Sequence, residues 1–222
     1  MNQPVEIARQ QTAILETNKV LKNTYALLSM TLLFSAFAAY ISMQLEMPGF
    51  MPLVASFGAL GLIWLVLPRT ANSSMGIVVV FAITGLLGLG LGPILNNYLQ
   101  LSNGSQLIMT SLGGTGVIFF ALSGYALVSR RDFSFMGGML VAGLVMVIIA
   151  ALANIFMEIP ALSLAISAVV ILIMSGFILY DTSRIINGGE TNYILATVGL
   201  YLSLYNIFVH LLMLLGVLSG DD

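Results

Sequence analysis

The chain has 222 residues, of which 59% are hydrophobic and only 7% are charged, with a formal net charge of −2. A soluble domain carries roughly 25% charged residues, so this composition excludes a water-soluble fold and indicates a polytopic membrane protein of one domain. The chain has no cysteine, which excludes thiol catalysis, disulfide bonds and thiolate metal sites.

The distribution of apolar residues predicts a polar tail followed by seven spans. We expect the tail Met1–Asn23 to lie outside the bilayer and residues 24–222 to form the transmembrane domain. Each span is close to the roughly 17–25 residues that a membrane helix needs. The predicted spans are Tyr25–Met43, Met51–Leu67, Met75–Leu95, Leu107–Val128, Met136–Met157, Ala161–Tyr180 and Ile194–Leu218. The predicted fold class is therefore an all-α membrane protein with seven transmembrane helices.

All the basic residues fall on one side of this arrangement. Arg9, Lys19 and Lys22 lie in the tail, Arg69 in the second loop, Arg130 and Arg131 in the fourth, and Arg184 in the sixth. Because positively charged loops stay in the cytoplasm, we expect a cytoplasmic N-terminus and a C-terminus on the outer side.

The last span carries a stripe of polar and small residues at helical spacing. Gly199, Ser203, Asn206 and His210 are separated by four, three and four positions, which places them on one face of a helix. A polar face is not turned to lipid, because each unsatisfied polar group there costs several kcal/mol. We therefore expect the other helices to enclose this helix, with His210 in a hydrogen-bonded packing role or a proton relay.

Asp181 directly continues an apolar span on the basic side, and it has two interpretations. Ionisable groups at membrane depth are functional candidates, so Asp181 is either a proton- or cation-sensitive gate or a helix-end residue paired with Arg184. Arg69 is a second cation that would stabilise the charged form of Asp181, and Ser203 is a hydroxyl donor for it.

The glycines of the third span have two interpretations as well. Gly85, Gly88, Gly90 and Gly92 precede Pro93. Small residues let membrane helices approach closely, so the pattern favours tight packing, with a Gly-Pro hinge as the alternative.

Several classes of enzyme are excluded by missing residues. No Lys follows Lys22 to bind retinal, and His210 is the single histidine, so no histidine metal site exists. Asp181 is the one Asp available to the bundle, since Asp132 lies in a loop and Asp221 and Asp222 are terminal, which excludes a paired-aspartate protease. We expect no enzyme, no catalytic residue, no metal, no cofactor and no nucleic-acid partner.

Several motifs point to a known family. The segments ILYDTSRII, GGETNY and GLYLSLYNIF, together with TGLLGLGLGPIL and ALANIFMEIPALSLAISAV, resemble the Bax-inhibitor family of seven-helix membrane proteins. The resemblance runs from Asn18 through nearly the whole chain. It implies six helices around a central seventh and, in some members, a calcium- and pH-sensitive leak.

In those members an Asp on the sixth helix and an Asp on the seventh form a pair that holds the pore closed. Asp181 matches the first, whereas Ser203 stands where the resemblance places the second. A serine cannot share a proton with a neighbouring carboxylate, so Ser203 argues against a paired-acid sensor of calcium or protons.

The sequence is most similar to a bacterial branch of the family, and this implies a location in the inner membrane with a periplasmic C-terminus. The branch implies binding to the protease FtsH and its partners HflK and HflC, as a slowly degraded substrate and competitor. The tail then serves as the handle that the protease grips, through Asn2, Gln3, Arg9, Glu16 and Lys19. The loop Thr182–Tyr193 is the second cytoplasmic surface open to a partner.

Overall fold

The structure is a computed structural model that describes the backbone of residues 3–220 and the side chains of residues 15–220. The described residues are almost entirely helical and contain no β-strand. The elements are α1 (Gln3–Gln44), α2 (Met51–Gly61), the π-helical turn η1 (Leu62–Val66), α3 (Leu67–Thr70), α4 (Met75–Leu99), α5 (Gly104–Ser129), the 3-10 turn η2 (Ser134–Met136), α6 (Gly137–Met157), α7 (Pro160–Ile186) and α8 (Tyr193–Leu218).

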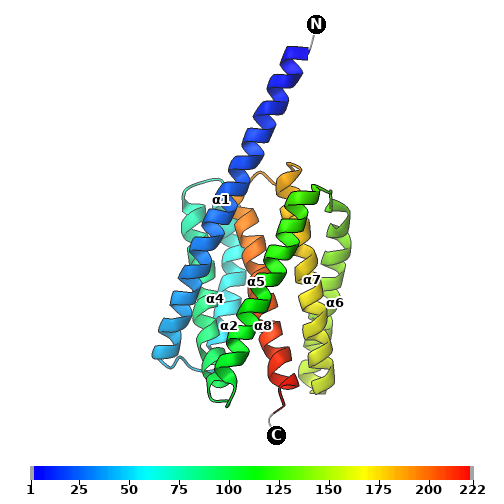
Figure 1. Cartoon of the computed structure of the whole chain (residues 1–222). Coiled ribbons are helices and arrows are strands. Elements are labelled where there is room, and N and C mark those ends of the chain that lie inside the picture. Colours follow the sequence, from blue (N-terminus) through cyan, green and yellow to red (C-terminus); the bar gives the residue numbers. More distant parts are fainter. Residues whose placement is uncertain (1–2, 221–222) are drawn as a thin grey trace.

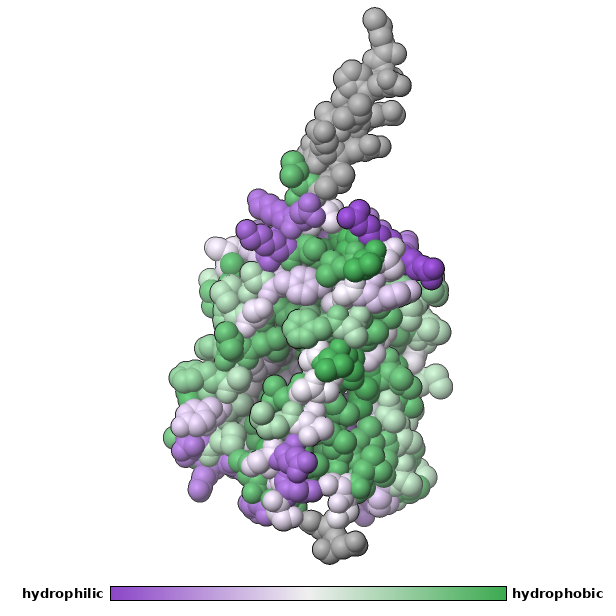
Figure 2. Space-filling view, viewed as in Figure 1, coloured by the Kyte–Doolittle hydropathy of each residue, from purple (hydrophilic) through white to green (hydrophobic). Residues whose placement is uncertain are grey.

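Seven helical segments are long and apolar enough to cross a membrane, which confirms the predicted fold class. They are Leu15–Gln44, Met51–Thr70, Met75–Leu99, Gly104–Ser129, Ser134–Met157, Pro160–Ile186 and Tyr193–Leu218. The helices run side by side as a bundle, and the two termini lie at opposite ends of it (Figure 1). Apolar residues cover the middle of the bundle and polar residues gather at both ends (Figure 2). The first part of α1 extends beyond the bundle as a continuation of the first span (Figure 1).

The last helix, α8, packs against four others. Its neighbours are α1, α4, α5 and α7, whereas α2 lies outside against α4 and α6 lies outside against α7. Among the described residues α8 contacts neither α2 nor α6. The expected arrangement of six helices around a central seventh is therefore not confirmed. The enclosed face of α8 is nonetheless well buried, with Leu200, Tyr201, Ile207 and Leu212 each at most 1% exposed.

Glycines of α4 allow α1 to approach closely. A Cβ on Gly88 would collide with the carbonyl oxygen of Ser35, and a Cβ on Gly92 would collide with the hydroxyl of Ser42. Helix α4 also continues without interruption through Pro93 to Leu99. The glycines therefore serve helix packing, the first of the two interpretations.

Pro93 would leave one backbone group unsatisfied inside the membrane. Proline has no N–H, so the carbonyl of Leu89, four residues earlier, loses its helical donor. The Ser42 hydroxyl of α1 donates to that carbonyl over 2.6 Å. A side chain from the neighbouring helix thus replaces the missing bond, as the apolar environment requires.

The second span is interrupted near its end, which the sequence did not predict. Pro68 removes a helical donor, and the preceding turn η1 widens so that the N–H of Leu67 bonds the carbonyl of Leu62. The hydroxyl of Thr70 and the guanidinium of Arg69 then donate to the carbonyls of Val66 and Leu65. The span consequently extends to Thr70 instead of ending at the predicted Leu67.

Candidate functional site

Asp181 of α7 faces the stripe on α8. A Cβ built on Gly199 would lie 2.8 Å from the Oδ2 atom of Asp181, so the carboxylate occupies the space that the missing side chain leaves. The Asp181 side chain is partly buried. Among the described residues it accepts no hydrogen bond and forms no ion pair, which makes it a carboxylate without a fixed partner between two helices.

Arg184 does not pair with Asp181 in the described structure. Its Nη2 atom lies 3.4 Å from Oε2 of Glu190 and donates to the carbonyl of Gly189 over 3.0 Å. The guanidinium also lies 5.5 Å from the ring centre of Tyr180. Arg184 therefore holds the loop after α7, so the helix-end pair with Asp181 does not form.

Arg69 is also engaged elsewhere, because its guanidinium donates to the Leu65 carbonyl of its own segment. Of the four residues expected at the gate, Asp181 and Ser203 lie on facing helices near Gly199. The two arginines bond other groups.

Ser203 satisfies its hydroxyl within its own helix. The side chain is 2% exposed, and Oγ donates to the carbonyl of Gly199 over 3.1 Å. Asn206 likewise donates to the carbonyl of Leu202 over 2.8 Å. These bonds fix the side chains without linking them to one another, so the stripe is not a continuous chain of hydrogen bonds.

His210 bonds a residue of α7 that the sequence did not reveal. Its Nδ1 atom lies 3.0 Å from the hydroxyl of Ser167, and that hydroxyl donates to the sulfur of Met213 over 3.3 Å. The tautomer of the His210 ring decides which of these two atoms, Nδ1 or the Ser167 oxygen, donates. Together with the contact at Gly199, this bond places the stripe along α7.

Side chains join the loops at the basic end of the bundle. Asn192 caps α8 by accepting from the N–H groups of Ile194 and Leu195. The same side chain donates to the carbonyl of Ala71 over 3.0 Å and to the amide oxygen of Asn72 over 2.9 Å. The loop after α7 is thereby fixed to the loop before α4.

The loop after α5 is fixed to α7 through Ser183. The Ser183 hydroxyl donates to the carbonyl of Arg131 over 3.1 Å and accepts from the N–H of Phe133 over 2.9 Å. Ser183 and Thr182 are fully buried, and α7 continues to Ile186. The surface expected over Thr182–Tyr193 is therefore reduced to the short loop 187–192. We call this loop, together with the loops before α4 and after α5 that are bonded through Asn192 and Ser183, the platform.

Of the residues expected to form the handle, Asn2 lies outside the described residues, and the structure describes only the backbone of Gln3 and Arg9. Glu16 and Lys19 are exposed on α1.

Comparison with known proteins gives the same family as the motifs. The chain matches the family model described as "Inhibitor of apoptosis-promoting Bax1" over residues 17–220. It is 54% identical, across all of both chains, to "Modulator of FtsH protease YccA" of Escherichia coli strain K12. The same identity and coverage hold for "Inner membrane protein YccA" of Escherichia coli O6:H1. An "Uncharacterized membrane protein" of Vibrio cholerae is 51% identical, covering 94% of this chain and 93% of that protein. This chain therefore belongs to the Bax inhibitor family.

Proposed function

We propose that this chain is an inner-membrane protein that binds and modulates a membrane AAA protease of the FtsH type, and that it is not itself an enzyme. The observation that carries the proposal is the 54% identity, over the whole of both chains, to a protein named as a modulator of FtsH. The similarity includes the first helix and every loop, which are the parts that a protease in the same membrane can reach. The name of a second relative supports the inner membrane as the location.

Modulation would follow if the chain occupies the protease as a slow substrate and so delays other substrates. Helix α1 extends beyond the bundle at the end where α4 begins and where α5 and α7 end (Figure 1). The segments at these helix ends carry Arg69, Arg131 and Arg184. A short helix without neighbours is only marginally stable in water, so the protease can unwind this extension at little cost. The bundle resists, because pulling a span from the membrane exposes its apolar side chains to water.

The platform formed by the loops around Asn192 and Ser183 offers a second contact surface beside the handle. Its hydrogen bonds fix the backbone, so binding it costs little conformational entropy. The family resemblance implies contacts with HflK and HflC as well, and we include them in the proposal.

Affinity purification of the full chain from bacterial membranes tests the proposal. An FtsH-type protease, with HflK and HflC, should be enriched relative to an unrelated seven-helix protein. Deleting Asn2–Thr17 should leave the chain in the membrane, lengthen its half-life and increase its inhibition of the protease. Enrichment of no AAA protease would contradict the proposal, and unchanged turnover of the shortened chain would place the handle in the platform.

A cation leak gated at Asp181 is the second candidate function. The unpartnered carboxylate against Gly199 is the observation that favours it, with calcium or protons as the conducted ion. The hydroxyl of Ser203 bonds the backbone and supplies no second carboxylate. Protease modulation therefore remains the preferred function, and a flux measurement described below separates the two.

A further inference from the structure

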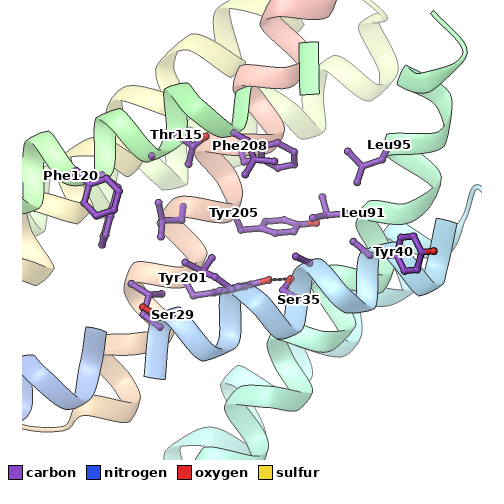
Figure 3. A pocket seen from close by; sticks show the side chains of 18 of the residues that line it. Ser29, Ser35, Tyr40, Leu91, Leu95, Thr115, Phe120, Tyr201, Tyr205 and Phe208 are labelled. Atoms are coloured by element: carbon purple, nitrogen blue, oxygen red, sulfur yellow. Dashed lines mark hydrogen bonds between the residues drawn. The ribbon is translucent and has the colours of Figure 1, made fainter. Parts of the chain in front are cut away.

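A groove opens on the side of the bundle between α1 and α5. Its cavity has a volume of about 450 Å³, with α1 and α5 at its sides and α8 and α4 behind (Figure 3). In the space-filling view it is the hollow in the middle of the apolar face (Figure 2). Among the described residues α1 and α5 do not pack closely on one another, so the groove faces the lipid. We call it the α1–α5 groove.

Side chains close one end of the groove and leave its length open. The hydroxyl of Tyr25 on α1 lies 2.8 Å from the hydroxyl of Ser123 on α5, and the ring of Tyr25 lies 5.9 Å from that of Phe119. The rest of the lining is mostly apolar and none of it is charged. The ring of Tyr205 extends across the cavity toward Leu91 (Figure 3).

The length of the groove matches the depth of the hydrocarbon core. The lining of α1 runs from Tyr25 to Met43, a length of about 27 Å at 1.5 Å per residue. This length is close to the thickness of the hydrocarbon core, about 30 Å, so a single extended hydrocarbon chain fits along the groove.

A positive charge lies just beyond the closed end. Lys22 is exposed on α1 and precedes Tyr25 by three residues, which places both on the same side of the helix. Lys19 is exposed one turn further out. Basic residues at the end of a membrane helix attract anionic lipid headgroups, and a lysine at this position reaches the interface with its long side chain.

We propose that the α1–α5 groove binds one acyl chain of an anionic phospholipid, with the lipid phosphate beside Lys22. The chain fills a space that the packed side chains leave empty and gains contacts with α1, α4, α5 and α8 at once. The charge of Lys22 then selects among headgroups, because a zwitterionic lipid offers it no net negative charge. The site is distinct from Asp181 and from the platform, so it does not depend on the proposed function.

Glycines of α5 provide a matched pair of variants. Gly116 lines the groove, and a Cβ placed there meets no atom within 4 Å, so Gly116→Leu puts a side chain into the cavity. Gly113 is exposed one turn earlier, has the same free space and does not line the groove. Gly113→Leu therefore makes the same chemical change on the same helix outside the site.

The experiment measures lipids retained by the full chain. The protein is reconstituted in vesicles of equal parts phosphatidylglycerol and phosphatidylethanolamine, extracted in mild detergent and analysed by native mass spectrometry. The wild type should retain one phosphatidylglycerol per chain. Gly116→Leu should reduce that occupancy about tenfold. Gly113→Leu should bind as the wild type does.

The role of Lys22 is tested in the same assay. Lys22→Gln should reduce the preference for phosphatidylglycerol about fivefold, the effect of one lysine near a membrane surface, while Lys22→Arg keeps it. Equal retention of the two lipids by the wild type would overturn the proposal, as would equal retention by Gly116→Leu and the wild type. A wild-type dimer that Gly116→Leu dissociates would also overturn it, because a second copy would then occupy the groove.

Discussion

The carboxylate of Asp181 in α7 packs directly onto Gly199 in α8, with Oδ2 2.8 Å from the place where a Cβ of residue 199 would lie. Position 199 therefore requires glycine because the Asp181 side chain occupies the space of a Cβ, and not because the backbone there has a positive φ. The contact joins the acidic candidate residue to the stripe of α8, and one turn further along that stripe lies the buried Ser203.

Gly199→Ala should destabilise the bundle by about 1–3 kcal/mol, because the new methyl group overpacks the contact with Asp181. In an Asp181→Ala background the same substitution should cost less, with a coupling energy above about 0.5 kcal/mol. Chemical unfolding in mixed micelles measures both values. Gly124→Ala is the control, since a Cβ there meets nothing within 4 Å. Additive effects of the two substitutions would contradict the contact.

Tyr201→Phe should lower the free energy of unfolding by about 1–2 kcal/mol. The Tyr201 hydroxyl lies 2.6 Å from that of Ser35 on α1 and donates to the carbonyl of Thr84 on α4 over 3.3 Å, so the substitution removes a link among three helices (Figure 3). Thermal unfolding in detergent is the measurement. Tyr40→Phe removes the hydroxyl of an exposed tyrosine and should have little effect. Equal melting temperatures for wild type and Tyr201→Phe would refute the link.

Ser42→Ala should destabilise the protein by about 1–3 kcal/mol, because it leaves the Leu89 carbonyl without a donor in an apolar environment. The same substitution should cost less in a Pro93→Ala background, since residue 93 then supplies an N–H to that carbonyl. Unfolding curves of the four proteins in the cycle measure the difference. Ser56→Ala serves as the control, because that hydroxyl donates to Pro52 in its own helix. An undiminished cost in the Pro93→Ala background would show that Ser42 has another role.

Ser203→Asp tests the leak. It places a second carboxylate one turn from Gly199, where two neighbouring carboxylates would share a proton and respond to pH together. Calcium flux into liposomes should be weak and independent of pH for the wild type and should become pH-dependent in the variant. Ser203→Ala introduces no carboxylate and should behave as the wild type does. A strong pH-gated leak through the wild-type protein would favour the channel over the protease modulator.

The charges of the loops predict the orientation of the bundle. Reporter domains fused after Asp222 should be active only on the periplasmic side, because the positive-inside rule predicts that the basic loops stay in the cytoplasm. Fusions in the loop 187–192 should give the opposite result. A reporter at Asp222 that is active in the cytoplasm would place both termini on one side of the membrane. That result would contradict seven spans, because an odd number of spans puts the termini on opposite sides.

The sequence alone was sufficient to identify the seven spans and the family. Span length and hydropathy are local properties, so the predicted segment Met75–Leu95 differs from α4 by four residues at one end and by none at the other. The motifs around Asp181 and Gly199 likewise identified the family, later matched over residues 17–220. The polar stripe predicted that the other helices enclose α8, and in the structure two residues of the stripe, Gly199 and His210, contact α7.

The tertiary structure decided which residues meet. Apolar side chains of a membrane helix face lipid and neighbouring helices alike, so hydropathy does not tell which face is buried. Ser167 as the partner of His210, Ser42 as the donor opposite Pro93 and the four neighbours of α8 all depend on how the helices are rotated and spaced. The α1–α5 groove arises for the same reason, because it exists only where two helices distant in sequence lie side by side without closing on each other.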